Sequence, residues 1–302
     1  MSLPLAPALD DLHFTIENAT TLTHPQWQLV AVLLMVGYGA HLAFSVFFLA
    51  ASTQVAPRYR LVPWMSAVVM LAAGLSLFRQ FSAWSDTYAF VGTLWVPRAE
   101  FVFDNAYRYA NWTITIPLLL AQLLLALNLP QRVLRRRFVV LVIAAWAMVW
   151  TGLTGQFFEH ANVAAMLAWG FVSTIPFVVL VYLVWKSLRE ARGTTPPALH
   201  PWLKNLFYFF LFFWGLYAIA YMVPAFGDEG GAVVIRQLLY TIADVFSKLV
   251  FGLILSRFVL RRSAMEGYAP AKDALAAWEG LTLAGGGTET DPARTPANAP
   301  AE

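Results

Sequence analysis

The sequence predicts an all-α membrane protein built as a bundle of seven transmembrane helices. Of its 302 residues, 59% are hydrophobic and only 12% are charged, a composition that a water-soluble domain of this size does not sustain. The charged residues are gathered between long apolar stretches, as expected when lipid is the solvent. A soluble enzyme is therefore excluded. The net charge of +3 is too small and scattered for a nucleic-acid-binding protein, and the lack of cysteine excludes disulfides and thiolate metal sites.

Seven apolar stretches are each long enough to cross a bilayer core of about 30 Å as a helix. Residues 1–26 precede them without a basic, apolar leader pattern, and we expect this segment to form a cap. Residues 27–262 then form the helical domain, and the polar, Ala/Gly/Pro/Thr-rich residues 263–302 are expected to be a disordered tail. The expected spans are 27–51, 61–81, 106–127, 138–158, 163–185, 205–223 and 233–260.

The connections between these spans alternate in charge. One set is acidic or neutral and includes residues 86–104, where Gly92 and Pro97 suggest a short hairpin. The other set and the end of the last span are basic. By the positive-inside rule, the basic side is cytoplasmic, so the N-terminus lies outside and the C-terminus inside. The basic residues are Arg58, Arg60, Arg132, Arg135, Arg136, Arg137, Lys186, Arg189, Arg192, Arg261 and Arg262.

One ionisable pair lies well inside the seventh span. Lys248 is near its middle, where a charged group is costly and usually marks a functional site. Asp244 lies one turn earlier on the same helix face. A purely structural ion pair is disfavoured because desolvating two charges usually outweighs their attraction. A lysine that carries a carbonyl cofactor as a Schiff base, with Asp244 as its counter-ion, explains the pair better.

Aromatic residues could wall such a cofactor. The sixth span places Trp214, Tyr217 and Tyr221 at spacings of three and four residues, and the third span carries Trp112. Such rings can enclose a flat polyene. Taken alone, however, this pattern is more often ordinary helix packing.

Three motifs are similar to those of one family. They are Tyr-Arg-Tyr-Ala-Asn-Trp-Thr-Ile-Thr-Ile-Pro at 107–117, the aromatic set at 214–221, and Asp-Val-Phe-Ser-Lys at 244–248. With them, the chain resembles the microbial rhodopsins over all seven spans. It looks most like the sodium-pumping and related bacterial chloride-pumping rhodopsins, a resemblance carried by residues 66–70, 155–159 and 236–244.

This resemblance implies a multi-pass protein of a bacterial inner membrane. It implies all-trans retinal bound covalently to Lys248, with Asp244 and the four aromatic residues around it. It also implies a homo-oligomer, either a pentamer or a trimer. In some relatives, a glycine leaves an opening for a carotenoid antenna, and Gly152 matches that position, although a close helix contact is the simpler explanation for it.

The resemblance further implies that residues 111, 115 and 122 indicate which ion is moved. Here they are Asn111, Thr115 and Gln122. Amides cannot exchange protons near neutral pH, which disfavours a proton pump. The sodium-pumping relatives have Asp where this chain has Thr115. The triplet resembles that of light-driven chloride pumps, although the two amides could also be helix-to-helix hydrogen bonds and Thr115 could bond to its own helix.

A charge argument favours an anion as well. With Asn111 neutral, the protonated Schiff base and Arg108 carry two positive charges against Asp244 alone. A bound halide supplies the missing negative charge. We therefore expect an inward chloride pump, in which chloride arrives past Arg108, docks beside Asn111 and Thr115, and leaves by Gln122 after retinal changes from all-trans to 13-cis.

Some candidates and alternatives remain open. Arg79, near the outer end of the second span, could gather anions or simply extend to the membrane surface. Glu159 and Arg236 could pair as an extracellular gate or as an ordinary surface salt bridge. His41 receives no role. The alternative functions are a light sensor with a slow photocycle, and a sodium or proton pump that uses Asp244 as its proton acceptor.

Overall fold

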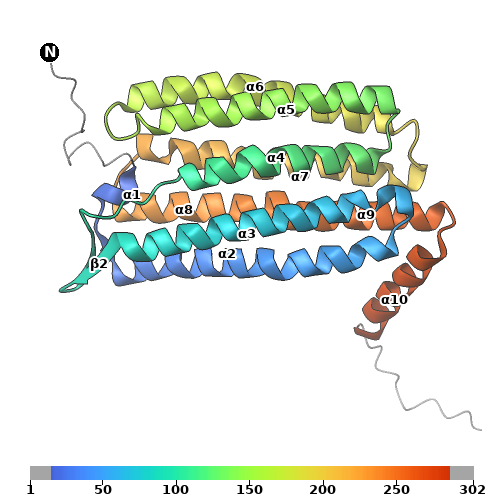
Figure 1. Ribbon diagram of the computed structural model, residues 1–302, viewed down its shortest axis with the longest axis horizontal. Helices are drawn as coiled ribbons and strands as arrows, with labels where there is room; N and C mark the ends of the chain where they lie inside the picture. Colours follow the sequence, from blue (N-terminus) through green and yellow to red (C-terminus); the bar gives the residue numbers. More distant parts are fainter. Residues whose placement is uncertain (1–14, 286–302) are drawn as a thin grey trace, which may run out of the picture.

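Seven long helices run side by side in the computed structural model, which describes residues 15–285 (Figure 1). All seven are long and apolar enough to cross a membrane. Their order along the chain is α2 (His24–Ala51), α3 (Leu61–Thr87), α4 (Ala106–Leu127), α5 (Gln131–Gln156), α6 (Val163–Ala191), α7 (His200–Met222) and a seventh span that begins with α8 (Gly230–Asp244) and ends with α9 (Phe251–Met265). The seven expected spans are therefore confirmed.

The ends of several helices lie beyond the apolar stretches that predicted them. Helix α5 begins at Gln131 rather than at residue 138, and its first two turns carry four arginines. Helix α3 likewise continues to Thr87 rather than ending at residue 81. Hydropathy marks only the part of a helix that lies in the hydrocarbon, whereas the backbone hydrogen bonds continue into the polar region beside it.

The seventh span changes its winding at the predicted lysine. Between α8 and α9, residues Val245–Val250 form a π-helix, and Lys248 lies within it. A π-helix accommodates one extra residue in a turn, and such turns are frequent at functional sites. The apolar residues of this stretch fit the spacing of an ordinary α-helix, so the sequence pattern does not predict the π-helix.

A small sheet and a short helix cover one end of the bundle. Strands β2 (Tyr88–Val91) and β3 (Leu94–Pro97) form the hairpin expected in the 86–104 connection, with Gly92 at a φ of +63° in its turn. Strand β1 (Leu22–Thr23) adds to β3, and α1 (Ile16–Ala19) precedes it. The expected cap is thus ordered over residues 15–23, while residues 1–14 lie outside the described part. We call this end the α1 end.

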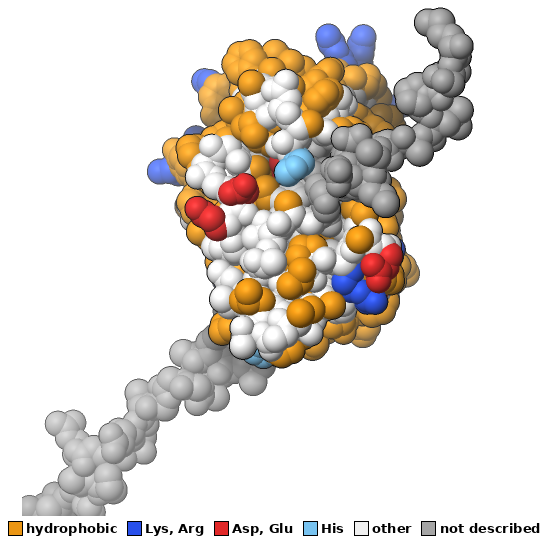
Figure 2. Space-filling view, turned by 90° about the vertical axis from the view of Figure 1, so that its left-hand side faces the viewer, with side chains coloured by type: hydrophobic (Ala, Val, Ile, Leu, Met, Phe, Trp, Pro, Cys, Tyr) orange, Lys and Arg blue, Asp and Glu red, His pale blue; other side chains and the backbone are white. Residues whose placement is uncertain are grey.

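The face of the α1 end differs from the sides of the bundle. Figure 2 shows acidic side chains, a histidine, Lys or Arg side chains and scattered hydrophobic side chains on this face, with hydrophobic side chains dense around its rim. The basic connections that follow α2, α4 and α6 lie at the opposite end (Figure 1). This separation fits a bundle whose sides face lipid and whose ends face water. Which end faces the cytoplasm stays a prediction from the Lys/Arg distribution.

The prediction of a disordered tail over residues 263–302 is wrong for its first part. Helix α9 continues to Met265, and α10 (Ala269–Gly285) follows and packs against it with Ala271 fully buried. Alanine is the best helix former, and Ala271, Ala274 and Leu275 share one helix face. Because this face consists of two alanines and one leucine, its pattern was hidden within a composition typical of linkers. Residues 286–302 lie outside the described part. We call the end of the bundle opposite the α1 end the α10 end.

Candidate functional site

Lys248 and Asp244 lie at the centre of a buried network. Both are at most 2% exposed, and Lys248 Nζ contacts Asp244 Oδ1 directly. Arg108 Nη1 donates to Asp244 Oδ2 at 2.8 Å, Trp112 Nε1 to Oδ1 at 3.2 Å, and the Tyr217 hydroxyl to Oδ1 at 2.8 Å. Lys248 Nζ also donates to the Tyr217 hydroxyl at 3.0 Å. We call Arg108, Asp244 and Lys248 the central cluster.

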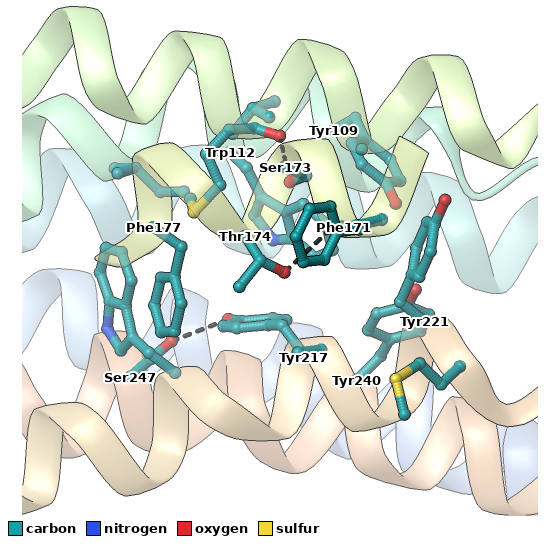
Figure 3. Close-up of a pocket in the computed structure, with 18 of the residues that line it drawn as sticks. Tyr109, Trp112, Phe171, Ser173, Thr174, Phe177, Tyr217, Tyr221, Tyr240 and Ser247 are labelled. Carbon is teal, nitrogen blue, oxygen red and sulfur yellow. Dashed lines mark hydrogen bonds between the residues drawn. The ribbon is translucent and has the colours of Figure 1, made fainter. Parts of the chain in front are cut away.

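A cavity of about 300 Å³ lies beside this cluster, with Lys248 in its lining. Its lining comes from α4, α5, α6, α7 and the seventh span, and the labelled side chains of Figure 3 are mainly aromatic. Trp112, Trp214, Tyr217 and Tyr221, the four aromatic residues expected around a cofactor, all line it, with Lys248 among them. The indole nitrogen of Trp214 is buried without a partner. An apolar cavity of this size with one amine in its wall fits a small polyene aldehyde.

Glycines let Tyr221 pack closely beside this cavity. A methyl group at Gly170 would lie 2.7 Å from Tyr221 Cε1, and one at Gly155 would lie 1.9 Å from the Tyr221 hydroxyl. That hydroxyl donates to the main-chain oxygen of Met166 at 2.8 Å. Gly152 of α5 faces Tyr109 of α4 and Ser173 of α6, and a methyl group there would lie 3.3 Å and 3.4 Å from them, so it makes a close helix contact while also lining the cavity. Tyr221 of α7 is therefore held in place by α5 and α6.

The three residues expected to select the ion are all buried in α4. Thr115 donates to the Asn111 main-chain oxygen at 2.9 Å, and Gln122 Oε1 accepts from Ser66 at 2.8 Å. These are the hydrogen bonds expected if the residues stabilise the helices and do not select an ion: Thr115 bonds to its own helix, and Gln122 bonds to a neighbouring one. The Asn111 Oδ1 and Gln122 Nε2 atoms are buried without partners. Since amide oxygen and nitrogen exchange places by a flip, Asn111 can present either an acceptor or a donor there.

A second buried cluster lies at the α1 end. Arg236 contacts Glu159 through Nη1, and its Nε lies 3.3 Å from Glu17 Oε1. The Ile16 main-chain N–H and the Gln156 amide also donate to Glu159. All three charged side chains are at most 2% exposed, so the pairing of Glu159 with Arg236 is confirmed as buried and not as a surface salt bridge. We call Glu17, Glu159 and Arg236 the end cluster.

Burial changes the pKa of one member of the end cluster, Glu159, and therefore the pH at which the cluster changes its charge. It raises the pKa of the Glu159 carboxyl above its ordinary value, although the Arg236 guanidinium beside it acts in the opposite direction. Glu159 therefore takes up a proton at a higher pH than an exposed glutamate does.

Gln237 joins the two clusters. Its Oε1 accepts from Arg108 Nη2 at 2.9 Å, and its Nε2 donates to Glu17 Oε1 at 2.6 Å. A continuous line of buried polar groups thus runs from Lys248 to the α1 end. The roles of Gln237, Glu17 and Ser66 were not predicted. An acidic residue in a cap and an amide beside Arg236 were visible in the sequence, but nothing in it paired them.

Arg79 belongs to neither cluster. Its side chain is exposed, donates to the Tyr107 hydroxyl at 3.1 Å and lies over that ring, 5.0 Å from its centroid. Its position on the surface of the bundle fits the expected extension toward water.

Comparison with known proteins agrees with this architecture. The pattern of the family described as bacteriorhodopsin-like protein matches residues 28–261, which is most of the chain. The chain belongs to the microbial rhodopsins. Members of this family bind retinal through a lysine Schiff base, and the chain is accordingly a multi-pass membrane protein.

Several relatives of this rhodopsin are curated or solved. It is 24% identical over 228 residues to a green-light absorbing proteorhodopsin from Gamma-proteobacterium EBAC31A08, covering 74% of this chain and 84% of the relative. It is 33% identical over 195 residues to archaerhodopsin-3 from Halorubrum sodomense, covering 63% and 70%. Xanthorhodopsin, described as a light-driven ion pump with dual chromophore, superposes with a TM-score of 0.76 at 34% identity, covering 82% of this chain and 98% of that one.

Proposed function

We propose that this rhodopsin is a light-driven inward chloride pump with retinal bound to Lys248. The observation that carries the proposal is the charge balance of the central cluster. Lys248 and Arg108 are two buried cations, and Asp244 is the one carboxylate in contact with them among the described residues. An excess positive charge without a second carboxylate in direct contact is costly in a low-dielectric interior, and a mobile anion bound beside it neutralises it.

The residues around Lys248 support a proton that stays on Nζ. Asn111 and Gln122 are amides, which neither bind nor release protons near neutral pH. Asp244 accepts hydrogen bonds from Arg108, Trp112, Tyr217 and Lys248, and such bonds favour its ionised form. Because the positive charge remains at Nζ, a cation is repelled from this position and a halide is attracted to it.

The rest of the chain supplies a path for the halide. When bound, retinal supplies the light-driven change from all-trans to 13-cis, which redirects the N–H at Lys248. Arg108 attracts chloride from the α1 end, and the Asn111 amide can hold it beside Lys248. Gln122 then lies further along α4 toward the α10 end, where its bond to Ser66 closes the route. For chloride to leave, that bond must open. Inward transport follows if the α10 end is cytoplasmic, as the Lys/Arg distribution predicts.

Illuminated cells test this proposal directly. A suspension in NaCl should become alkaline under light, because inward chloride draws protons passively after it. A protonophore should enhance the signal, and replacing chloride by sulfate should abolish it. Light-driven acidification that persists in sulfate would show an outward proton pump instead.

One observation favours a second candidate function. The direct contact between Lys248 and Asp244 is the geometry that a proton transfer to Asp244 would use. In that case the protein would be a proton or sodium pump. Flash spectroscopy in saturating NaCl separates the two, since transfer to Asp244 produces a strongly blue-shifted intermediate and a retained proton does not. A pigment that binds chloride but moves no net charge across a planar membrane would indicate a light sensor.

We also propose a homo-oligomer, a pentamer or a trimer, which mass measurement of the purified pigment tests. A carotenoid antenna is less well supported, because Tyr109 and Ser173 pack closely against Gly152, which also lines the cavity. Energy transfer from an added carotenoid to retinal would show that the cavity wall has an opening to the membrane.

A further inference from the structure

A second cavity at the α10 end lies between α6 and α7 and is strongly basic. Its volume is about 420 Å³. The residues that line it are Trp185, Leu188, Arg189, Arg192, Leu203, Lys204, Phe207 and Tyr208. Three of them are cations, and no acidic side chain is among these described lining residues. The right-hand ends of α6 and α7 in Figure 1 mark its position.

These three cations have no carboxylate partner within residues 15–285. Arg189 lies over the Trp185 ring, 5.4 Å from its centroid, and neither Arg192 nor Lys204 forms a salt bridge there. The neighbouring Arg137 of α5, by contrast, pairs with Glu190 at 2.8 Å. Like charges brought together in one cavity repel each other, so this arrangement favours a negatively charged ligand.

The connection between the two helices is ordered by its own contacts. His200 Nε2 lies 3.1 Å from the main-chain oxygen of Arg192 and 3.0 Å from that of Thr195. Pro197 then begins a short 3₁₀ turn, Pro197–Leu199, that leads into α7. Because these contacts order the connection, the cations on its two sides are positioned before any ligand arrives.

The cavity is basic at the end of the bundle and apolar toward its middle. Exposed apolar side chains continue along the same two helices, namely Val178, Val179 and Tyr182 on α6 and Leu211 and Phe212 on α7. A small soluble anion would use only the basic part. A ligand with a negative headgroup and two acyl chains would use both parts, and basic pockets between transmembrane helices are known binding places for such headgroups.

We propose that this cavity binds the headgroup of an acidic phospholipid, of which phosphatidylglycerol is the simplest example, with its acyl chains lying along α6 and α7. Trp185 and Tyr208, which are 40% and 58% exposed, then lie at the level where aromatic residues meet the headgroups. This inference does not depend on which ion the rhodopsin transports.

Native mass spectrometry of the delipidated full-length pigment tests the proposal, in the dark and without halide. The pigment is titrated with phosphatidylglycerol, with phosphatidylcholine of the same acyl chains, and with inorganic phosphate. Phosphatidylglycerol should bind at least tenfold more tightly than phosphatidylcholine. An excess of inorganic phosphate should not displace it. Displacement by phosphate, or equal affinity for the two lipids, would overturn the proposal.

A matched pair of triple variants separates this cavity from general surface charge. Arg189→Gln, Arg192→Gln and Lys204→Gln together should abolish the preference for phosphatidylglycerol. The control combines Arg132→Gln, Arg135→Gln and Arg136→Gln, which removes three exposed charges from the start of α5 without touching the cavity. The control should keep the preference within about twofold, a change smaller than the loss of one charge near a lipid surface produces. Equal losses in both variants would refute a specific site, and circular dichroism verifies that each variant keeps its helices.

Discussion

The central cluster and the end cluster are both buried and each contains three charged side chains, yet their charge balances are opposite. The central cluster has two cations and one carboxylate, whereas the end cluster has one cation and two carboxylates. Gln237 connects them, so together they are neutral when every group is ionised. The comparison shows that the protein places its excess positive charge beside the cavity and its compensating negative charge at the α1 end.

This arrangement has a consequence for an anion that approaches from the α1 end. The central cluster attracts it, but the end cluster lies on the way and repels it while both carboxylates are ionised. Protonation of Glu159, which its raised pKa favours, removes that repulsion. In the proposed chloride pump, the end cluster therefore works as a charge-sensitive barrier, and the central cluster as the binding position. Four substitutions test this division.

Asn111→Asp should have the largest effect, because it makes the central cluster neutral. A carboxylate about 4 Å from the bound halide would cost about 4 kcal/mol at an effective dielectric constant near 20, which is nearly a thousandfold in affinity. The halide-induced shift of the absorption maximum, titrated with NaCl in sulfate, should disappear. Asn111→Gln keeps the amide and should retain the shift. Unchanged chloride binding in Asn111→Asp would show that the missing charge is supplied elsewhere.

Arg236→Gln, in the end cluster, should lower thermal stability more than Arg108→Gln, in the central cluster, does. It leaves Glu17 and Glu159 buried without a cation, and breaking a buried ion pair in this way costs about 3 kcal/mol. Arg108→Gln leaves Asp244 paired with Lys248, so its thermal stability should fall by less while its chloride affinity falls by more. Melting followed by circular dichroism, together with halide titration, checks both values. The reverse order of stabilities would mean that the end cluster is not maintained by Arg236.

The ion pair inside each cluster could be predicted from the sequence, but the link between the two clusters could not. Lys248 and Asp244 are one helical turn apart in an apolar stretch, so their pairing follows from helix geometry alone. Arg236 and Glu159 were paired because both fall near the same end of their spans. Gln237 and Glu17 are 220 positions apart, and only the packing of α1 over the bundle brings them together. Helix α10 escaped prediction because its packing face is short and made mainly of alanine, within a segment rich in Ala, Gly, Pro and Thr.

Glu159→Gln should change how chloride affinity depends on pH. The pKa of Glu159 is raised, so at low pH the carboxyl is neutral and the barrier is weak. As the pH rises through that pKa, the carboxylate forms and chloride affinity should fall, by roughly two- to tenfold for one partly screened charge. The variant should show the low-pH affinity at every pH between 5 and 8. A pH dependence that survives in Glu159→Gln would assign it to another group.

Gln237→Met should have the smallest effect on affinity and the most specific one. Methionine fills a similar volume but removes the hydrogen bonds to Arg108 and Glu17, which leaves the charges of both clusters unchanged. If the clusters communicate through this amide, the pH dependence seen in the unmodified rhodopsin should become weaker by about twofold, while chloride affinity at low pH stays within about threefold of its original value. If they communicate only through the electric field of Glu159, the pH dependence should persist in full.

Gln237→Glu provides the matched contrast, because it keeps an acceptor for Arg108 but adds a negative charge next to the central cluster. It should therefore lower chloride affinity at all pH values at which the new carboxyl is ionised, which separates the loss of a hydrogen bond from the gain of a charge at one position.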